Sequence, residues 1–264
     1  MKIALIQINP LVGDLRGNAL KIKQQVILAK SKGADLAVTS ELALLGYPPR
    51  DLLLYPNFIA EAWQTLQTLA REIKFLSPIL VGTAIVNKNK SGRPLFNCAA
   101  FLKDGKIQEI FHKSLLPTYD VFDEDRYFEP VNEPQILKFN GKRIGISICE
   151  DLWNDRDFWQ KPRYHFDPIE KLAEEKADLI INLSSSPFTI EKQKLRESMI
   201  SVSSKKYKIP IIYVNQVGGN DDLIFDGSSI AFDNQGRLIA RAVAFKEDII
   251  FVDLGSKINK QSFS

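Results

Sequence analysis

The chain has 264 residues, of which 45% are hydrophobic and 25% charged, and this composition is typical of a globular protein with a sizeable core. A formal net charge of +3, without a dense block of lysine and arginine, argues against a nucleic-acid partner. No stretch approaches the roughly 18 apolar residues of a membrane span, and the N-terminus lacks the features of a signal peptide. Two cysteines are too few for a disulfide framework, so we expect a cytoplasmic protein with free thiols and no membrane partner.

The first half of the chain alternates between strand and helix patterns. Between residues 18 and 32 apolar residues recur near helical spacing, and Gly33 ends the pattern. Lys103-Asp104-Gly105 predicts the turn of a hairpin. We expect strands at 2–9, 35–40, 77–86, 94–102 and 106–113, and helices at 18–32 and 58–75.

The second half opens with a long irregular segment at 114–134 and contains a second hairpin turn at Asn140-Gly141. We find no internal repeat and no linker, so residues 1–255 are expected to form a single domain, followed by a flexible tail at 256–264. The mixture of strands and helices predicts a layered α/β sandwich with helices on the outer faces of two packed sheets. We expect strands at 134–139, 142–148, 178–184, 210–217, 228–233, 237–243 and 248–254, and helices at 165–177 and 189–207.

Glu41, Lys113 and Cys149 each lie at the end of a predicted strand. Taken singly, each has an ordinary explanation as a surface carboxylate, a solvated ammonium or a small buried hydrophobe. Cys98 lies in the middle of a strand among apolar neighbours and is expected to be such an inert thiol. Active groups are often found where strands end, so Glu41, Lys113 and Cys149 are candidates for one site.

The surroundings of Cys149 raise a chemical question, because Glu150 and Asp151 follow it directly and nearby acids disfavour a thiolate. A thiol that is to act as a nucleophile needs a base, and a carboxylate in a poorly hydrated pocket can take its proton. A lysine ammonium offsets the negative charge and can stabilise an oxyanion. Glu41 and Lys113 can therefore replace the histidine of a Cys–His pair.

Histidine is the weaker option for the base. His112 precedes Lys113 directly, so in a regular strand the two side chains point to opposite faces. His165 opens a predicted helix and is expected to be a cap or a surface residue.

Three motifs surround the candidate residues: TSELALLGYPPRDLL contains Glu41, HKSLLPTYDVFDEDRYF contains Lys113, and ICEDLW contains Cys149. On these motifs the chain resembles the nitrilase, or carbon–nitrogen hydrolase, superfamily over residues 1 to about 254. The segments GYPPRDLL, ICEDLW and NQVGGNDDLIFDGSS make it most similar to the glutaminase (amidotransferase) domains of glutamine-dependent NAD synthetases. The resemblance implies a single-domain α/β fold, the αββα four-layer sandwich, with a Glu-Lys-Cys triad.

The resemblance also implies roles for the matching residues. Glu41 would be the general base, Lys113 would stabilise the oxyanion, and Cys149 would be the nucleophile. The other implied site residues are Tyr119, Glu124, Glu150, Ser186 and Lys192. Glu124 would support the site and the other four would border the substrate, with Lys192 meeting its α-carboxylate. Without the resemblance, Lys192 is equally well explained as a helix-surface lysine.

One further motif, GGND at 218–221, could suggest a phosphate loop. No glycine-rich strand–loop–helix unit surrounds it, however, and the following residues continue as extended structure. We therefore expect a loop near the active site, as the resemblance implies.

The implied activity is hydrolysis of the side-chain amide of L-glutamine through a thioester on Cys149, releasing ammonia for NAD synthesis from deamido-NAD. Synthetases of this type also contain an ATP-pyrophosphatase loop of the Ser-Gly-Gly-x-Asp-Ser kind, which this sequence lacks. ATP and Mg would then be needed only in a synthetase domain or subunit, with no cofactor and no metal in this domain. We expect either a separate glutaminase subunit or a domain of a longer chain, with an NAD synthetase as partner, and a homo-oligomer by analogy.

Two alternatives remain open. The first is a free-standing amidase or nitrilase-type hydrolase that acts on another small amide, which would not prefer glutamine over simple ω-amides. The second is a partner-gated glutamine-binding subunit, inactive alone, whose glutaminase activity would rise when a synthetase is added.

Overall fold

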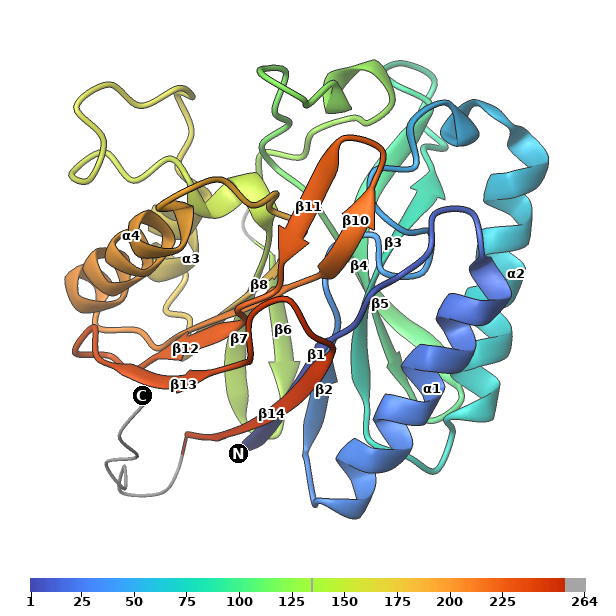
Figure 1. Ribbon diagram of the computed structural model, residues 1–264, viewed down its shortest axis with the longest axis horizontal. Helices are drawn as coiled ribbons and strands as arrows, with labels where there is room; N and C mark the ends of the chain where they lie inside the picture. Colours follow the sequence, from blue (N-terminus) through green and yellow to red (C-terminus); the bar gives the residue numbers. More distant parts are fainter. Residues whose placement is uncertain (134, 255–264) are drawn as a thin grey trace.

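In a computed structural model, residues 1–133 and 135–254 are described, and they form two six-stranded sheets and a separate hairpin (Figure 1). The first sheet has the strand order β14–β1–β2–β3–β4–β5, and these strands are Asp248–Asp253, Lys2–Gln7, Leu36–Val38, Ile79–Val86, Leu95–Lys103 and Lys106–His112. The second sheet has the order β13–β12–β9–β8–β7–β6, and its strands are Leu238–Arg241, Ile230–Phe232, Ile211–Asn215, Leu179–Ser184, Lys142–Ile148 and Ile136–Phe139. The tail predicted at 256–264 lies outside the described residues.

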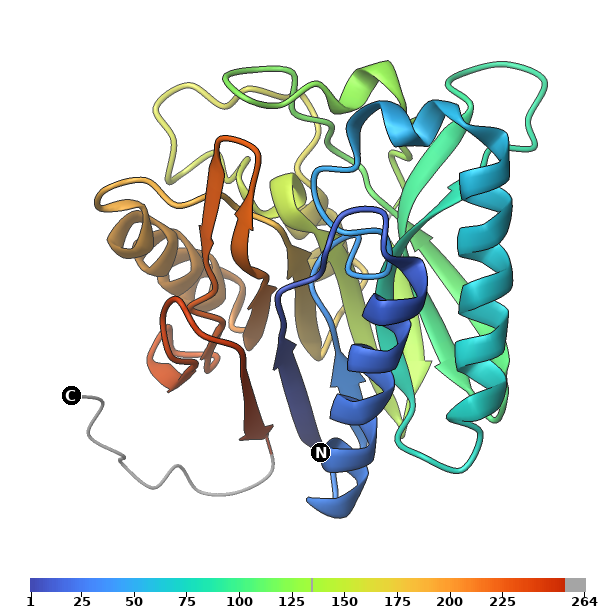
Figure 2. The same ribbon diagram turned by 45° about the vertical axis from the view of Figure 1, so that its right-hand side comes forward.

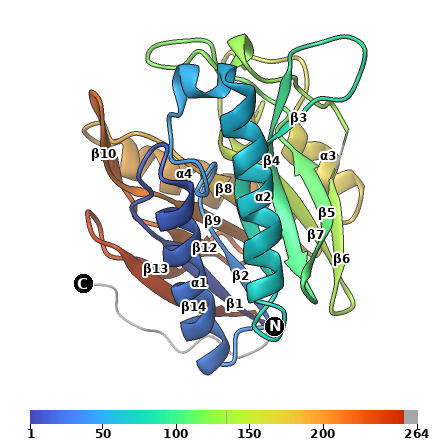
Figure 3. The same cartoon turned by 90° about the vertical axis from the view of Figure 1, so that its right-hand side faces the viewer.

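Helices cover the outer face of each sheet (Figures 2 and 3). The first sheet is covered by α1 (Leu15–Ser31) and α2 (Pro56–Glu72), and the second by α3 (Pro168–Glu174) and α4 (Lys192–Tyr207). This αββα order of layers confirms the predicted four-layer sandwich. Within the described part of the chain, no helix has both the length and the apolar character that crossing a membrane requires.

Strand β1 shows why the sheets need cover on both faces. Its side chains alternate: Ile3 and Leu5 pack in the core between the two sheets, whereas Ala4 and Ile6 pack in the core under the helices. All four are fully buried. The period of two in strand side chains therefore places β1 in two hydrophobic cores at once.

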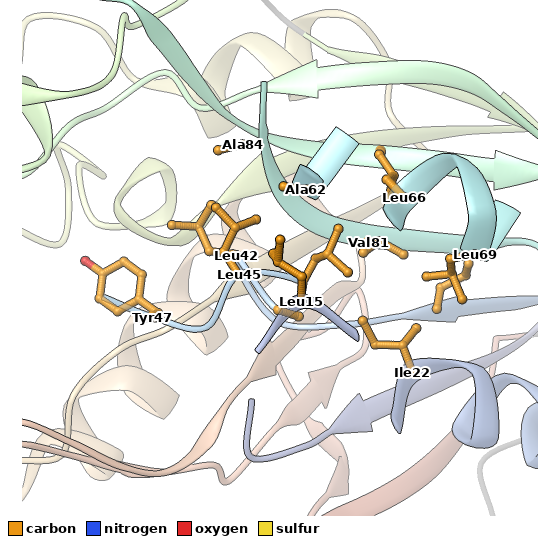
Figure 4. Packing of buried hydrophobic residues seen from close by; sticks show 14 of the residues in the cluster. Leu15, Ile22, Leu42, Leu45, Tyr47, Ala62, Leu66, Leu69, Val81 and Ala84 are labelled. Atoms are coloured by element: carbon orange, nitrogen blue, oxygen red, sulfur yellow. The ribbon is translucent and has the colours of Figure 1, made fainter. Parts of the chain in front are cut away.

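The helix layer on the first sheet is built from side chains at helical spacing (Figure 4). Ile22 and Val26 of α1 and Leu66 and Leu69 of α2 are almost completely buried and belong to one apolar cluster with the sheet. Helix α1 starts three residues earlier than predicted, because the Asp14 side chain accepts a hydrogen bond from the Gly17 backbone N–H at 2.9 Å and caps the helix there.

The strand directions bring the candidate residues to one end of the molecule. In the first sheet β1, β2 and β3 are parallel, and two antiparallel pairings, β3 with β4 and β4 with β5, turn β5 into the direction of β3. In the second sheet β7, β8 and β9 are parallel. The segments after β2 and β5 therefore lie at the same end of the first sheet, where parallel strands finish. The segments after β7 and β8 likewise lie at one end of the second sheet.

The stretch predicted as a loop at 218–221 is part of a β-hairpin. Strand β10 (Val217–Asn220) pairs antiparallel with β11 (Leu223–Asp226). Gly218 has φ +118°, and a Cβ atom there would lie 2.1 Å from Oδ1 of Asn9. The positive φ and the Asn9 side chain that lies against Gly218 thus account for the glycine without a phosphate.

Helix α3 is shorter than predicted, and His165 lies in the loop before it. The cap is Asp167, whose side chain accepts hydrogen bonds from the backbone N–H groups of Ile169 and Glu170 at 3.0 and 3.2 Å. The prediction that His165 opens the helix was wrong, because Asp167 followed by Pro168 is the stronger start signal.

Candidate active site

Glu41 and Lys113 meet in the interior of the molecule. Glu41 lies in the turn after β2, and Lys113 follows β5 directly. The Lys113 Nζ atom donates to Oε1 of Glu41 at 2.7 Å, and both side chains are completely buried. Two residues that are 72 positions apart in the chain thus form a buried ion pair.

Glu124 supports the ammonium of Lys113 from the other side. It begins the short 3₁₀ helix η2 (Glu124–Arg126), and both its carboxylate oxygens accept from Lys113 Nζ, at 2.9 and 2.7 Å. The hydroxyl of Tyr47 donates to the same carboxylate at 2.8 Å. Burial by itself lowers the pKa of Lys113, but the Glu124 and Glu41 carboxylates together raise it well above its usual value. The ammonium therefore stays charged although it is completely buried.

The Glu41 carboxylate is held by three donors. Besides Lys113, the Asn97 side-chain amide donates to Oε1 at 2.8 Å, and the Ser185 backbone N–H donates to Oε2 at 3.1 Å. The Ser185 hydroxyl also donates to the Glu41 carbonyl at 2.9 Å. This set of bonds fixes the orientation of the carboxylate, as a general base requires.

Cys149 begins the 3₁₀ helix η3 (Cys149–Leu152), directly after β7, and its backbone is left-handed with φ 46°. For a non-glycine residue this conformation costs about 1–2 kcal/mol and needs support from its surroundings. Asp151 supplies it: this carboxylate accepts from the backbone N–H of Ile148 at 2.8 Å and from those of Ser114 and Leu115 at 3.0 and 2.7 Å. Asp151 thereby joins the turn of the thiol to the segment that follows Lys113.

Cys149 is buried, with only 4% of its surface exposed. Burial raises its pKa well above the usual value, the Glu41 and Glu124 carboxylates raise it further, and the Lys113 ammonium and the Ser185 backbone N–H lower it. The resting group is therefore a thiol rather than a thiolate, and attack by sulfur requires that a neighbouring base accept its proton.

A pocket of about 310 Å³ opens over the thiol. Tyr119, Glu150, Ser186 and Lys192 line it together with Cys149, so the structure brings four of the five further predicted site residues to one cavity. Glu124 does not line this pocket, and neither do Glu41 and Lys113, with which it forms the buried network.

The pocket carries charges of both signs. Burial raises the pKa of Glu150, while hydrogen bonds from the Tyr119 hydroxyl at 2.9 Å and the Tyr164 hydroxyl at 3.1 Å lower it. Lys192 begins α4, and its Nζ lies 5.6 Å from the centre of the Trp153 ring. Burial lowers the pKa of Lys192. An anionic and a cationic side chain therefore border the same small cavity as the thiol.

His112 and Cys98 lie away from the thiol pocket. The rings of His112 and Phe96 pack edge-on, with their centroids 4.5 Å apart, whereas the Lys113 side chain reaches Glu41. The two side chains therefore differ in direction, as the alternation of strand side chains predicts. Cys98 is fully buried in β4, its Sγ lies 3.5 Å from the Thr83 carbonyl oxygen, and burial raises its pKa. Both cysteines are free thiols, as predicted.

Several groups that hold the site were not found from the sequence. Asn97, Tyr47 and Tyr164 each contact a predicted site residue, and Asp151 binds the backbone N–H of Ile148, the residue before Cys149. Asn97 and Tyr164 lie outside the three motifs, and no pattern in the sequence marks them. Tyr47 and Asp151 lie within the motifs, where the only expected effect of Asp151 was to repel a thiolate. Within the described ranges no cluster of three or more histidine, cysteine or acidic side chains could hold a metal ion.

The comparisons with known sequences agree with one another on the family of this chain. The chain matches the family model described as Carbon-nitrogen hydrolase over residues 2–259. It is 47% identical to the glutamine-dependent NAD(+) synthetase of Synechocystis sp., over 96% of this chain and 46% of that protein. It is 38% identical to the protein of the same name from Thermotoga maritima, over 96% of this chain and 42% of that one. The chain thus spans less than half the length of these relatives.

Solved structures give the same result for the fold. The glutamine-dependent NAD+ synthetase of Acinetobacter baumannii superimposes with a TM-score of 0.87 at 34% identity, over 100% of this chain and 48% of that chain. An amidase from Nesterenkonia sp. superimposes with a TM-score of 0.78 over 96% of this chain and 90% of that chain, and at 19% identity this likeness concerns the fold alone. From its match over residues 2–259 and its αββα sandwich, the chain belongs to the carbon–nitrogen hydrolase family.

Proposed function

We propose that the protein hydrolyses the side-chain amide of L-glutamine to glutamate and ammonia. The observation that carries the proposal is the combination of a buried Glu41–Lys113 pair and the Cys149 thiol with a small pocket that is lined by side chains of both charges, among them Glu150 and Lys192. Free glutamine carries an ammonium and a carboxylate on its α-carbon, so Glu150 and Lys192 match its two charges. A neutral amide would offer neither charge an oppositely charged group.

In the proposed mechanism Glu41 accepts the proton of the Cys149 thiol while sulfur attacks the amide carbonyl carbon. Lys113 stabilises the oxyanion of the tetrahedral intermediate, together with backbone N–H groups near Glu150. Glu41 then returns the proton to the departing nitrogen, and the C–N bond breaks to give ammonia and a γ-glutamyl thioester. Water, deprotonated by Glu41, attacks the thioester, and the released thiolate takes the proton back.

The test is a glutaminase assay on the purified protein, with glutamate and ammonia as readouts. Cys149→Ala should abolish turnover, and Cys98→Ala, which removes the other thiol from a fully buried site, should retain it. Full activity in Cys149→Ala would overturn the mechanism. A preference for a neutral amide such as butyramide over glutamine would favour a general amidase instead.

We further propose that the ammonia is used for NAD synthesis from deamido-NAD by a synthetase domain or subunit, which would also hold ATP and Mg. The relatives named glutamine-dependent NAD(+) synthetase support this proposal, because this chain covers less than half of their length. Adding a separately expressed ammonia-dependent synthetase should allow glutamine to replace ammonia in NAD formation. Glutaminase activity that appears only after this addition would identify a partner-gated subunit.

A further inference from the structure

Two basic residues at the thiol pocket have no role in the proposed mechanism. Lys161 and Arg163 belong to the loop at 153–166, which follows η3 and leads to α3. Both line the pocket together with Cys149, and both are exposed. In Figures 1 and 2 this yellow-green loop and the green segment after β5 lie at the same end of the sheets.

Arg163 is held in a defined position across the pocket mouth. The central carbon of its guanidinium lies 3.8 Å from the centre of the Tyr119 ring. The hydroxyl oxygen of the next residue, Tyr164, lies 3.1 Å from a Glu150 carboxylate oxygen and 3.4 Å from the Leu116 carbonyl oxygen. The loop is thus attached to the segment that carries Tyr119, and the guanidinium lies on that ring by a cation–π contact.

The cation–π contact does not use the N–H donors of the guanidinium as hydrogen-bond donors. The five N–H donors of arginine lie in the plane of the group. In the part of the chain that the structure describes, the Arg163 guanidinium makes no hydrogen bond and no ion pair with a carboxylate. Arg163 therefore presents a set of unused donors at the mouth of a pocket that suits a small charged molecule.

The chemistry of Arg163 differs from that of the other cations at the pocket. Its fork of N–H groups matches the two oxygens of a carboxylate, whereas a lysine ammonium is a point charge. Lys192 lies in the same cavity and contacts Trp153. A carboxylate in the pocket consequently has two cationic side chains available to bind it, Lys192 and Arg163.

We propose that Arg163 is a specificity-determining residue that binds the α-carboxylate of the substrate, with Tyr119 as the platform that orients it. This inference rests on the proposed glutaminase function and assigns to Arg163 a preference for ω-amides that carry a carboxylate. Arg163 does not take part in the chemical step, so its loss acts on substrate affinity.

Three substrates distinguish the contributions of the two charges of glutamine to binding. L-Glutamine carries both charges, glutaramate carries the carboxylate only, and butyramide carries neither. Arg163→Gln should lower kcat/KM for glutamine and for glutaramate by about tenfold, mainly through KM, and leave that for butyramide unchanged. Arg156→Gln is the matched control, because Arg156 is an exposed arginine of the same loop that does not line the pocket and donates to the His165 carbonyl at 2.9 Å.

Binding is measured in parallel, so that the inference does not depend on turnover. In the Cys149→Ala background, calorimetry should show a Kd for glutamine about tenfold higher with Arg163→Gln and unchanged with Arg156→Gln. Equal losses for all three substrates, or no change in glutamine affinity, would overturn the role of Arg163. A wild-type protein that binds glutamine through Arg163 but does not hydrolyse it would refute the proposed function alone.

Discussion

Lys113 decides the electrostatics of the site, because it is the cation between two buried carboxylates. Its Nζ lies 2.7 Å from the nearest oxygen of both Glu41 and Glu124. A buried ion pair adds little net stability compared with an apolar pair, but removing one partner leaves an uncompensated charge. We therefore expect the residue to contribute to stability as well as to the proposed chemistry.

We expect Lys113→Met to destabilise the protein by about 3–5 kcal/mol near pH 8 and by less near pH 5. Burial already raises the pKa of Glu124, and loss of the ammonium, which lowers it, should raise it further. A carboxyl group whose pKa is raised in the folded state stabilises the fold at low pH, and this contribution is lost as the pH rises through that pKa. Urea unfolding of both proteins at the two pH values measures the effect.

The matched control for this prediction is Lys171→Met. Lys171 also forms an ion pair at 2.7 Å, with Glu174, but both side chains are largely exposed. Its loss should leave the free energy of unfolding nearly unchanged, with no marked dependence on pH, because exposed ion pairs are screened by solvent. An equal effect of both substitutions would contradict a special contribution of the buried Lys113 ammonium.

Glu150 should make the preference for glutamine dependent on pH. Burial raises the pKa of this carboxyl group above the usual value of 4.5, so it takes up a proton at a pH where an ordinary glutamate is still ionised. In the proposed function, protonation removes the partner of the substrate ammonium. The ratio of kcat/KM for glutamine to that for butyramide should therefore fall on acidification, with a midpoint above 4.5. Glu150→Gln should abolish this dependence, and a ratio that stays constant with pH would exclude the role.

At the scale of elements, the hairpin β10–β11 is attached to α4 by a buried ion pair. Arg196 is fully buried and Asp226 is 2% exposed, and the two guanidinium NH₂ groups lie 3.3 and 3.1 Å from the carboxylate oxygens. Arg196 lies one turn after Lys192 on the same helix. The pair therefore links the hairpin to the helix that brings Lys192 to the pocket.

We expect Arg196→Met to destabilise the protein by about 3–5 kcal/mol, because it leaves Asp226 buried without its cation. The double variant Arg196→Met with Asp226→Leu should recover most of this loss, since both charges are then removed together. Urea unfolding of the two single variants and the double variant measures the coupling. Additive losses would show that the two side chains do not act as a pair.

At the scale of the whole molecule, the two sheets share one apolar core. Residues of both sheets, among them Leu5, Ile144 and Ile181, belong to the same buried cluster. Loss of packing in this cluster affects both sheets, so we infer that the two sheets unfold as one unit. The predicted homo-oligomer concerns this same scale and stays a prediction.

Leu5→Ala should therefore lower the free energy of unfolding by about 2–5 kcal/mol while the transition remains single. Tryptophans report on both halves, because Trp63 lies on α2 whereas Trp153 and Trp159 flank the thiol pocket. Far-ultraviolet circular dichroism and tryptophan fluorescence should give coincident transitions. Ile224→Ala, at a side chain that is 56% exposed, should change stability by about 0.5 kcal/mol or less. Two separated transitions would contradict a single unit.

Much of the fold was predictable because local patterns agree with the tertiary structure. The alternation in β1 and the turns at 104–105 and 140–141, where all four residues have positive φ, are local in sequence. The hairpin β10–β11 was not predicted, because Gly218 and Gly219 have a low strand propensity. Its strands depend on pairing with each other and on the Arg196–Asp226 contact, whose partners are 30 positions apart in the chain.

The sequence by itself determined the layered α/β class and, through three motifs, the triad candidates Glu41, Lys113 and Cys149. The tertiary structure alone decided the partners of these groups, such as Asn97 at Glu41 and Asp151 at the turn of Cys149. The reason is physical: strand and turn patterns arise from neighbours in the chain, whereas the charge state and orientation of a buried group depend on donors from distant segments.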